Sequence, residues 1–173
     1  MKRLYLLHAA RPRVDPSLNL SDYHLPLTRR GEILAAQLGK FMLKQGYSPD
    51  LVICASPARA RLTLSNMWAY LASSAHPQQI IHDYRIHLMK GEELLSQLQQ
   101  LEERYKEVLL VGARRGVDEL AKLLVRPSED SSLTALPELA PGALMVFDCG
   151  TAPWTSLAPG SARLLETYNA RLV

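Results

Sequence analysis

The sequence predicts an α/β fold, a three-layer sandwich in which helices cover both faces of a mostly parallel sheet. Three short and almost wholly apolar runs lie far apart in the chain, at 3–7, 50–55 and 107–112. Runs of this kind are typical of strands that are buried on both faces. Segments in which apolar residues recur at helical spacing alternate with them, which predicts parallel strands joined by crossover helices. With 173 residues, 47% of them hydrophobic, the chain is predicted to form a single domain (1–173) with a substantial core.

Helical spacing of apolar residues predicts four helices, at 28–45, 56–71, 92–105 and 117–124. Gly46 follows the first helix, at a position where glycine commonly ends one. Ser56 and Pro57 suit the N-cap and the first helical position of the second helix. Asp118 and Glu119 suit the first turn of the fourth helix, where the helix dipole favours acidic side chains.

Further strands complete the predicted sheet. A weaker strand is expected at 79–84 and a buried one at 143–148. The segments 154–157 and 162–168 are expected to form a closing hairpin, joined through Ala-Pro-Gly-Ser. Irregular connections are predicted where prolines interrupt the pattern, at 11–27 and 127–141.

Charge balance and cysteine content limit the class of protein. Twenty Lys and Arg residues against 17 Asp and Glu give a net charge of +3, too close to balance to indicate a nucleic-acid-binding protein. Cys54 and Cys149 lie in apolar runs and give no disulfide framework, which favours a cytoplasmic location. The apolar run at 3–7 is too short for a signal peptide or a membrane span, so no membrane association is expected.

Basic residues follow the three strongest strands, at the sheet edge where α/β proteins bind ligands. They are His8, Arg11, Arg59, Arg61, Arg114 and Arg115. Two of these strand ends lead directly into helices, whose first-turn N–H groups favour anions. The sequence therefore predicts a pocket for phosphate or another small anion. Arg61 is expected on the surface, and Arg114 is favoured over Arg115 as a member of the pocket.

The remaining candidate groups favour structural roles. Cys54 and Arg59, in the segment CASPAR, faintly resemble the loop of cysteine phosphatases. The spacing is one residue short, and the segment has no glycines to turn its amides inward, so a buried strand thiol is predicted. His76, His82 and His87 show no metal-ligand spacing with carboxylates or thiols. Neither a metal nor a cofactor is predicted.

Five segments occur in an order and spacing typical of one family. They are RLYLLHAARP, PLTRRGEILAAQLGKFM, LVICASPARARLT, VLLVGARRGVDELAKLL and LAPGSARLLE. Together they resemble the histidine phosphatase superfamily, and within it the short bacterial phosphohistidine phosphatases of the SixA type. In that family the first strand ends in an Arg-His pair, whose His is the nucleophile and whose Arg binds phosphate. A second Arg, after the second strand, and a second His, after a later strand, complete the phosphate site. The resemblance implies the histidine-phosphatase fold for this chain.

The resemblance is incomplete at the catalytic positions. Aligned without a gap, the family Arg falls on His8, the nucleophilic His on Ala9 and the second His on Ala113. The helical Arg is kept as Arg59. Arg114 stands next to the second lost His and is able to replace it as an electrostatic clamp. A methyl group has no lone pair with which to attack phosphorus, so the resemblance implies a loss of catalysis.

The leading hypothesis is a pseudophosphatase with a basic pocket for phosphate or a phosphorylated ligand. The pocket residues it names are His8, Arg59, Arg114 and Arg11. Two alternatives stay open. If the first strand is shifted by one residue, His8 is the nucleophile of an active phosphatase. If the pocket is vestigial, the chain is an interaction module that recognises a partner protein. Asp22 and His24 lie where the family carries a polar loop over the pocket, and a surface position is expected for both.

Overall fold

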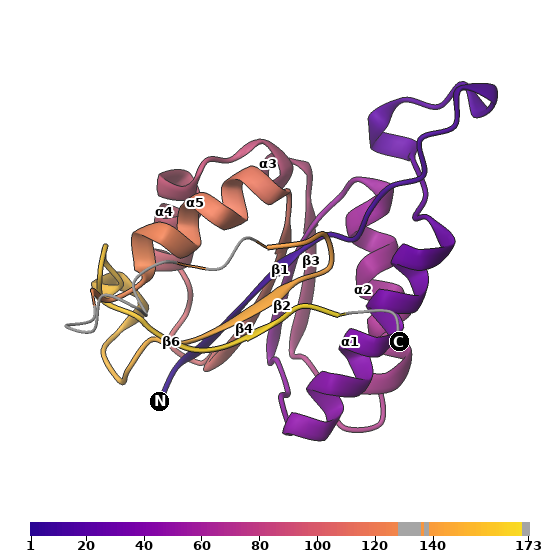
Figure 1. Ribbon diagram of the computed structural model, residues 1–173. Helices are drawn as coiled ribbons and strands as arrows, with labels where there is room; N and C mark the ends of the chain where they lie inside the picture. The colour runs from indigo at the N-terminus through magenta and orange to yellow at the C-terminus, as the bar shows by residue number, and fades with distance from the viewer. Residues whose placement is uncertain (128–135, 137–138, 171–173) are drawn as a thin grey trace.

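The computed structural model describes residues 1–127, 136 and 139–170, which are built around one six-stranded sheet (Figure 1). The strands are β1 (Arg3–His8), β2 (Leu51–Ala55), β3 (Gln79–Asp83), β4 (Glu107–Gly112), β5 (Leu144–Asp148) and β6 (Arg163–Tyr168). Their order in the sheet is β3-β2-β4-β1-β5-β6. The first four in this order run parallel, whereas β5 is antiparallel to both of its neighbours. The predicted mostly parallel sheet is confirmed.

Helices cover both faces of this sheet. They are α1 (Arg29–Gln45), α2 (Ala58–Leu71), α3 (Tyr84–Leu88), α4 (Gly91–Gln99) and α5 (Arg114–Leu124). Short 3-10 turns lie at η1 (Pro16–Leu18), η2 (Asp22–His24) and η3 (Trp154–Ser156). Figure 1 shows α1 and α2 packed together on one side of the sheet, with α4 and α5 packed together on the other. The predicted three-layer sandwich is therefore confirmed.

Burial explains why the apolar runs form the central strands. In β1, β2 and β4 both faces are covered by helices, so almost every side chain is buried. At the sheet edge, β3 is mostly exposed, which accounts for its weak pattern. The predicted boundaries of α1 are also confirmed: the Thr28 hydroxyl accepts the Gly31 N–H at 2.9 Å, and Gly46 ends the helix with a φ of 70°.

Three predicted helix boundaries are wrong. The helix predicted over 117–124 begins at Arg114, so Asp118 and Glu119 lie in its second turn and not in its first. The helix after β2 begins at Ala58 and Pro57 occupies its N-cap, so Ser56 is not the cap. The helix predicted over 92–105 ends at Gln99. The physical reason lies just beyond it, at Glu103. This carboxylate is 2.8 Å from the Lys2 ammonium and accepts the Trp154 N–H at 2.7 Å, so distant parts of the chain hold it outside any helix.

The predicted closing hairpin is also wrong. Its first half is the 3-10 turn η3, and its second half, β6, pairs with β5. Trp154 explains the difference, because its side chain is 1% exposed and its indole N–H donates to the Tyr105 carbonyl at 2.9 Å. That burial directs the segment beneath α4 and away from strand pairing. Most of the predicted connection at 127–141 lies outside the described residues.

Candidate functional site

The carboxyl ends of β1 and β4 meet at one edge of the sheet. Their parallel register pairs His8 with Gly112, and the Ala9 N–H donates to the Gly112 carbonyl at 3.1 Å. Ala9 and Ala113 follow directly after this pair, so they occupy matching positions at the strand ends. Neither methyl side chain can bind or transfer a proton. The edge where the fold gathers its strand ends therefore has two chemically inert residues at its centre.

His8, the last residue of β1, is held by the turn at 140–143. Its Nδ1 lies 3.2 Å from the Ala140 carbonyl oxygen. Its backbone N–H donates to the Ala143 carbonyl at 3.0 Å, and its own carbonyl accepts the Gly142 N–H at 2.9 Å. Gly142 has a φ of 85°, in the left-handed region that favours glycine, and this allows the turn to fold back onto the strand. The ring is thus fixed at the sheet edge and only 7% of the residue is exposed.

The pKa of His8 shows which charges act on its ring. Burial lowers the pKa of His8 below its ordinary value, and the positive charges of Arg114 and Arg59 lower it further. The hydrogen bond to Ala140 and the negative charge of Asp118 act in the opposite direction. The imidazole is therefore neutral at neutral pH. Three of the predicted pocket residues, His8, Arg59 and Arg114, share this one electrostatic environment.

Arg59, in the first turn of α2, already holds a carboxylate. Its Nη1 and Nη2 donate to Oδ1 and Oδ2 of Asp22 at 2.8 and 3.1 Å, a bidentate pair. Asp22 comes from η2, in the loop between β1 and α1. Its side chain is 61% exposed, as expected for a surface residue, yet it covers the guanidinium group of Arg59. His87 lies next to this pair, with Nε2 3.9 Å from Asp22 Oδ2. Burial and the charge of Arg59 lower the pKa of His87.

Thr63 ties the start of α2 to the end of β1. Its hydroxyl donates to the Arg59 carbonyl at 2.6 Å and accepts the Ala10 N–H at 2.9 Å. The residue is 0% exposed, so both bonds are sheltered from water. Thr63 thereby sets the distance between the Arg59 turn and the residues that follow His8.

Arg114 begins α5 and lies beside a carboxylate from the same helix. Its Nε is 3.5 Å from Oδ2 of Asp118, one helical turn further on. The other oxygen of Asp118, Oδ1, is buried and has no hydrogen-bond partner among the described residues. The sequence predicts Asp118 only as an acid in the first turn of its helix, whereas in the structure its negative charge acts on His8. The spacing of four residues between Arg114 and Asp118 is the feature of the sequence that indicates their pairing on one face of the helix.

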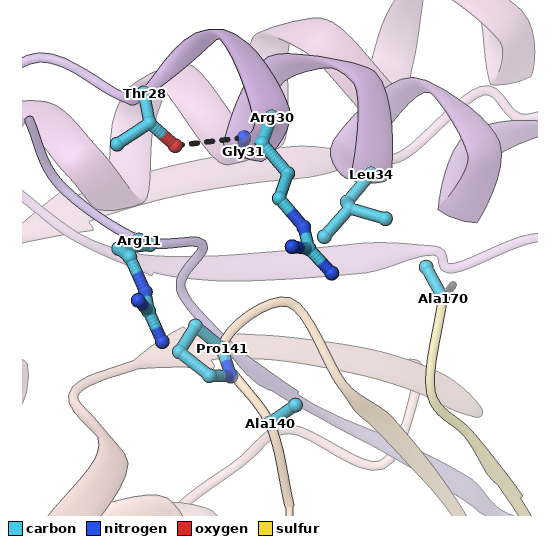
Figure 2. A pocket seen from close by; sticks show the side chains of 8 residues that line it. All are labelled: Arg11, Thr28, Arg30, Gly31, Leu34, Ala140, Pro141 and Ala170. Carbon is cyan, nitrogen blue, oxygen red and sulfur yellow. Dashed lines mark hydrogen bonds between the residues drawn. The ribbon is translucent and has the colours of Figure 1, made fainter. Parts of the chain in front are cut away.

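Arg11, the fourth predicted pocket residue, lies apart from the other three. It lines a cavity at the start of α1 whose walls do not include His8, Arg59 or Arg114. Figure 2 shows Arg11 there together with Arg30, a residue that the sequence did not single out.

Solved structures match the fold of this chain over almost its whole length. A protein of Nakamurella multipartitia described as the phosphohistidine phosphatase SixA is 23% identical, with a TM-score of 0.82 over 97% of this chain and 95% of that one. An Agrobacterium tumefaciens protein of the same description is 22% identical, with a TM-score of 0.78 over 98% of both chains. A SixA complexed with tungstate is 17% identical, with a TM-score of 0.77 over 96% of both chains. The chain has the histidine-phosphatase fold.

Sequence similarity to known proteins covers a shorter part of the chain than the structural similarity does. No protein-family model matches it. An uncharacterized chloroplastic protein of Arabidopsis thaliana is 29% identical over 130 residues, which are 71% of this chain and 59% of the plant protein. The match therefore spans less than two thirds of that relative's length.

The other candidate groups of this histidine-phosphatase fold lie outside the His8 environment. Arg61 is exposed and donates to the Ser56 carbonyl at 2.7 Å. Arg115 is exposed and pairs with Glu119 at 3.0 Å. Cys54 is buried in β2, as predicted, and burial raises the pKa of its thiol to about 12, which keeps it protonated and unreactive at neutral pH.

Two features of the described residues concern metals and membranes. Among those residues, no three His, Cys, Asp or Glu side chains gather in a way that could hold a metal ion. In the same part of the chain, no helix combines the length and the hydropathy needed to cross a bilayer.

Proposed function

We propose that this chain is a pseudophosphatase that binds phosphate, or the phosphoryl group of a larger ligand, between His8, Arg59 and Arg114. The observation that carries the proposal is the pair of alanines, Ala9 and Ala113, at the matching ends of β1 and β4. They occupy the positions on which the two histidines of the resembling family fall. Of the two arginines that bind phosphate in that family, the second is kept as Arg59, and Arg114 adds a cation where both of these imidazoles are absent.

The chemistry of phosphoryl transfer supports the inactive half of the proposal. A phosphohistidine mechanism needs a ring nitrogen in line with phosphorus, and cations on the equatorial oxygens. Ala9 offers only a methyl group. Loss of a covalent nucleophile typically reduces the rate by several orders of magnitude.

Charge and geometry support the binding half. Arg59 and Arg114 lie in the first turns of α2 and α5, where the helix dipoles add positive potential. The bidentate pair of Arg59 with Asp22 is the geometry with which guanidinium groups bind oxyanions. A phosphate is expected to take the place of the Asp22 carboxylate. The tungstate complex of one structural neighbour involves an oxyanion of similar shape.

Titration calorimetry with inorganic phosphate tests the binding half. Arg59→Gln is expected to weaken binding about tenfold or more, because a hydrogen bond to a charged group contributes roughly 1.5–3 kcal/mol. Arg61→Gln, an exposed change in the same helix, is the matched control and is expected to leave affinity unchanged. If the wild-type chain bound no phosphate, the pocket would be vestigial and the interaction-module alternative would gain support.

One observation favours an active phosphatase as the second candidate. With Nδ1 donating to the Ala140 carbonyl and the pKa of His8 lowered, Nε2 carries an unprotonated lone pair at neutral pH. Such a nitrogen is chemically able to attack phosphorus. Incubation with labelled phosphoramidate should then leave an acid-labile label that His8→Asn removes. Absence of label, under conditions in which a SixA protein becomes labelled, would exclude this candidate.

The remaining expectations stay predictions. A cytoplasmic location, and the absence of nucleic-acid and membrane partners, rest on composition alone. The plant relative is described as chloroplastic.

A further inference from the structure

A second group of cations lies at the start of α1. A partly enclosed cavity of about 170 Å³ is lined there by Arg11, Arg30 and the beginning of the helix on one side, and by Ala140 and Pro141 on the other. Figure 2 shows the Arg30 side chain extending from α1 and the Arg11 side chain extending from the loop after β1, both on the side of the cavity that faces Pro141. The cavity therefore presents two guanidinium groups to whatever occupies it.

Neither guanidinium group is neutralised within the described part of the chain. No hydrogen bond or ion pair joins the side chain of Arg11 or Arg30 to any described residue. Their neighbour Arg29 differs, because it pairs with Glu32 at 3.2 Å. Both residues are exposed, so water screens the repulsion between them, and an anion between them would be attracted by both charges.

The backbone holds the two arginines in place, although they are distant in sequence. The Arg11 carbonyl accepts the Thr28 N–H at 3.0 Å, and a bridge between Pro12 and Leu27 continues this pairing. Thr28 is also the N-cap of α1, and Arg30 lies in the first turn of that helix. The positive end of a 17-residue helix therefore adds to the two side-chain charges.

The turn at 140–143 stands between this cavity and the His8 environment. The Ala140 carbonyl faces Nδ1 of His8, whereas Ala140 and Pro141 also form a wall of the cavity. The groups that shift the pKa of His8 include Arg59 and Arg114. The two basic regions thus share one turn and use different cations.

The size of the cavity limits what it can hold. A volume of about 170 Å³ is enough for several water molecules. Pockets for drug-sized ligands and cofactors are larger, at roughly 300–1,000 Å³. A phosphate or carboxylate group fits within the cavity and matches the arginine forks.

We propose that this cavity is a second anion site, in which Arg11 and Arg30 together bind one oxyanion group of phosphate or carboxylate size. The site does not depend on the function proposed for His8, Arg59 and Arg114. Its two guanidinium groups donate to the oxygens of a single group, while the dipole of α1 stabilises the negative charge. The bound group is either a free ion or the anionic end of a longer molecule that extends into solvent.

Nuclear magnetic resonance of the arginine Nε–Hε groups tests the site directly. The full chain is titrated with inorganic phosphate and, separately, with acetate. The resonances of Arg11 and Arg30 are expected to shift and saturate together with at least one of the two ions. The ion that binds more tightly identifies the preferred oxyanion.

Variants separate this site from the first one. Arg30→Gln is expected to weaken the saturating shift of Arg11 at least tenfold, whereas Arg29→Gln, its neighbour in the same turn, should change it less than twofold. Arg59→Gln should leave the shifts of Arg11 and Arg30 intact even if it abolishes binding near His8. Shifts that never saturate, shifts confined to Arg59 and Arg114, or equal losses in the Arg29 and Arg30 variants would each overturn the proposal.

Discussion

The two basic regions of this molecule differ in where their counter-charges lie. At the carboxyl edge of the sheet, Arg59 is paired with Asp22 at 2.8 Å and Arg114 with Asp118 at 3.5 Å. In the cavity at the start of α1, Arg11 and Arg30 have no such partner among the described residues. The first region therefore binds an anion by exchanging it for a carboxylate, whereas the second binds one by addition.

This difference predicts distinct energetics. Exchange at Arg59 breaks an ion pair, but that pair contributes little because Asp22 is largely exposed to water. Addition between Arg11 and Arg30 breaks no ion pair, and the repulsion between these two exposed residues is screened by water. Anion binding at Arg59 should therefore change when Asp22 or the elements that position Arg59 are altered. Anion binding in the cavity should change when Arg11 or Arg30 is substituted.

The largest expected effect comes from Thr63, which connects the start of α2 to the end of β1. Thr63→Val removes the hydroxyl that accepts the buried Ala10 N–H. An unsatisfied buried donor costs about 1–3 kcal/mol, so the free energy of unfolding should fall by that amount in a urea titration. Phosphate binding near Arg59 should weaken as well, because its turn loses an anchor.

Two controls sharpen this prediction. Ser65→Ala, which removes an exposed hydroxyl from the same helix, should change the free energy of unfolding by less than about 0.5 kcal/mol. Anion binding at Arg11 and Arg30 should change less than binding at Arg59, because the bond between Arg11 and Thr28 is untouched. A Thr63→Val protein as stable as wild type would show that the Ala10 N–H finds another acceptor.

The fold was largely predictable because its central strands are specified locally. The apolar runs of β1, β2 and β4 need no knowledge of distant residues to be recognised as buried strands. The errors lie where distant residues decide. Glu103 is held outside a helix by Lys2, and Trp154 is drawn beneath α4 by the Tyr105 carbonyl. No local pattern contains either partner.

In the candidate site, too, the residues placed by local patterns were predictable and those placed by distant contacts were not. His8, Arg59 and Arg114 lie in one environment because strand order and helix starts carry them there, and the alternation of strands and helices predicts both. Arg11 is directed elsewhere by its backbone bond to Thr28, which no periodicity reveals. The sequence does not predict that Asp22 pairs with Arg59, because Asp22 lies in a 3-10 turn of a proline-containing loop. No periodic pattern indicates where the side chains of such a loop point.

A smaller effect is expected from Asp22, the carboxylate that competes for Arg59. Asp22→Asn removes its charge and weakens the competition, so phosphate affinity measured by calorimetry should rise about two- to fivefold. This range corresponds to the roughly 0.4–1 kcal/mol that an exposed ion pair contributes. Asp15→Asn, in the same loop but paired with Arg13, is the matched control and should leave affinity unchanged. A lower affinity in Asp22→Asn would mean that Asp22 orients Arg59 for binding instead of competing with the ligand.

The smallest effect concerns the pH dependence of stability, which also separates the two regions. The folded protein lowers the pKa of His8 below the value of about 6.5 expected in the unfolded chain. As pH falls below about 6.5, the unfolded chain binds a proton that the folded chain resists, so the free energy of unfolding decreases. His8→Gln should flatten this decrease. Melting curves measure it between pH 7.5 and 5, which is roughly the pH range that linkage predicts, in a buffer free of phosphate. His87 contributes in the same direction and should account for part of the slope that remains.

Added phosphate turns this measurement into a comparison of the two sites. An oxyanion beside His8 favours the protonated imidazole, so saturating phosphate should reduce the acid destabilisation of the wild-type protein. The reduction should persist in Arg30→Gln, because that arginine lies on the other side of the turn at 140–143. It should be smaller in Arg59→Gln at the same phosphate concentration, because the anion near His8 then binds more weakly. If Arg30→Gln removed the reduction and Arg59→Gln did not, phosphate would bind in the cavity alone and the His8 region would have no ligand.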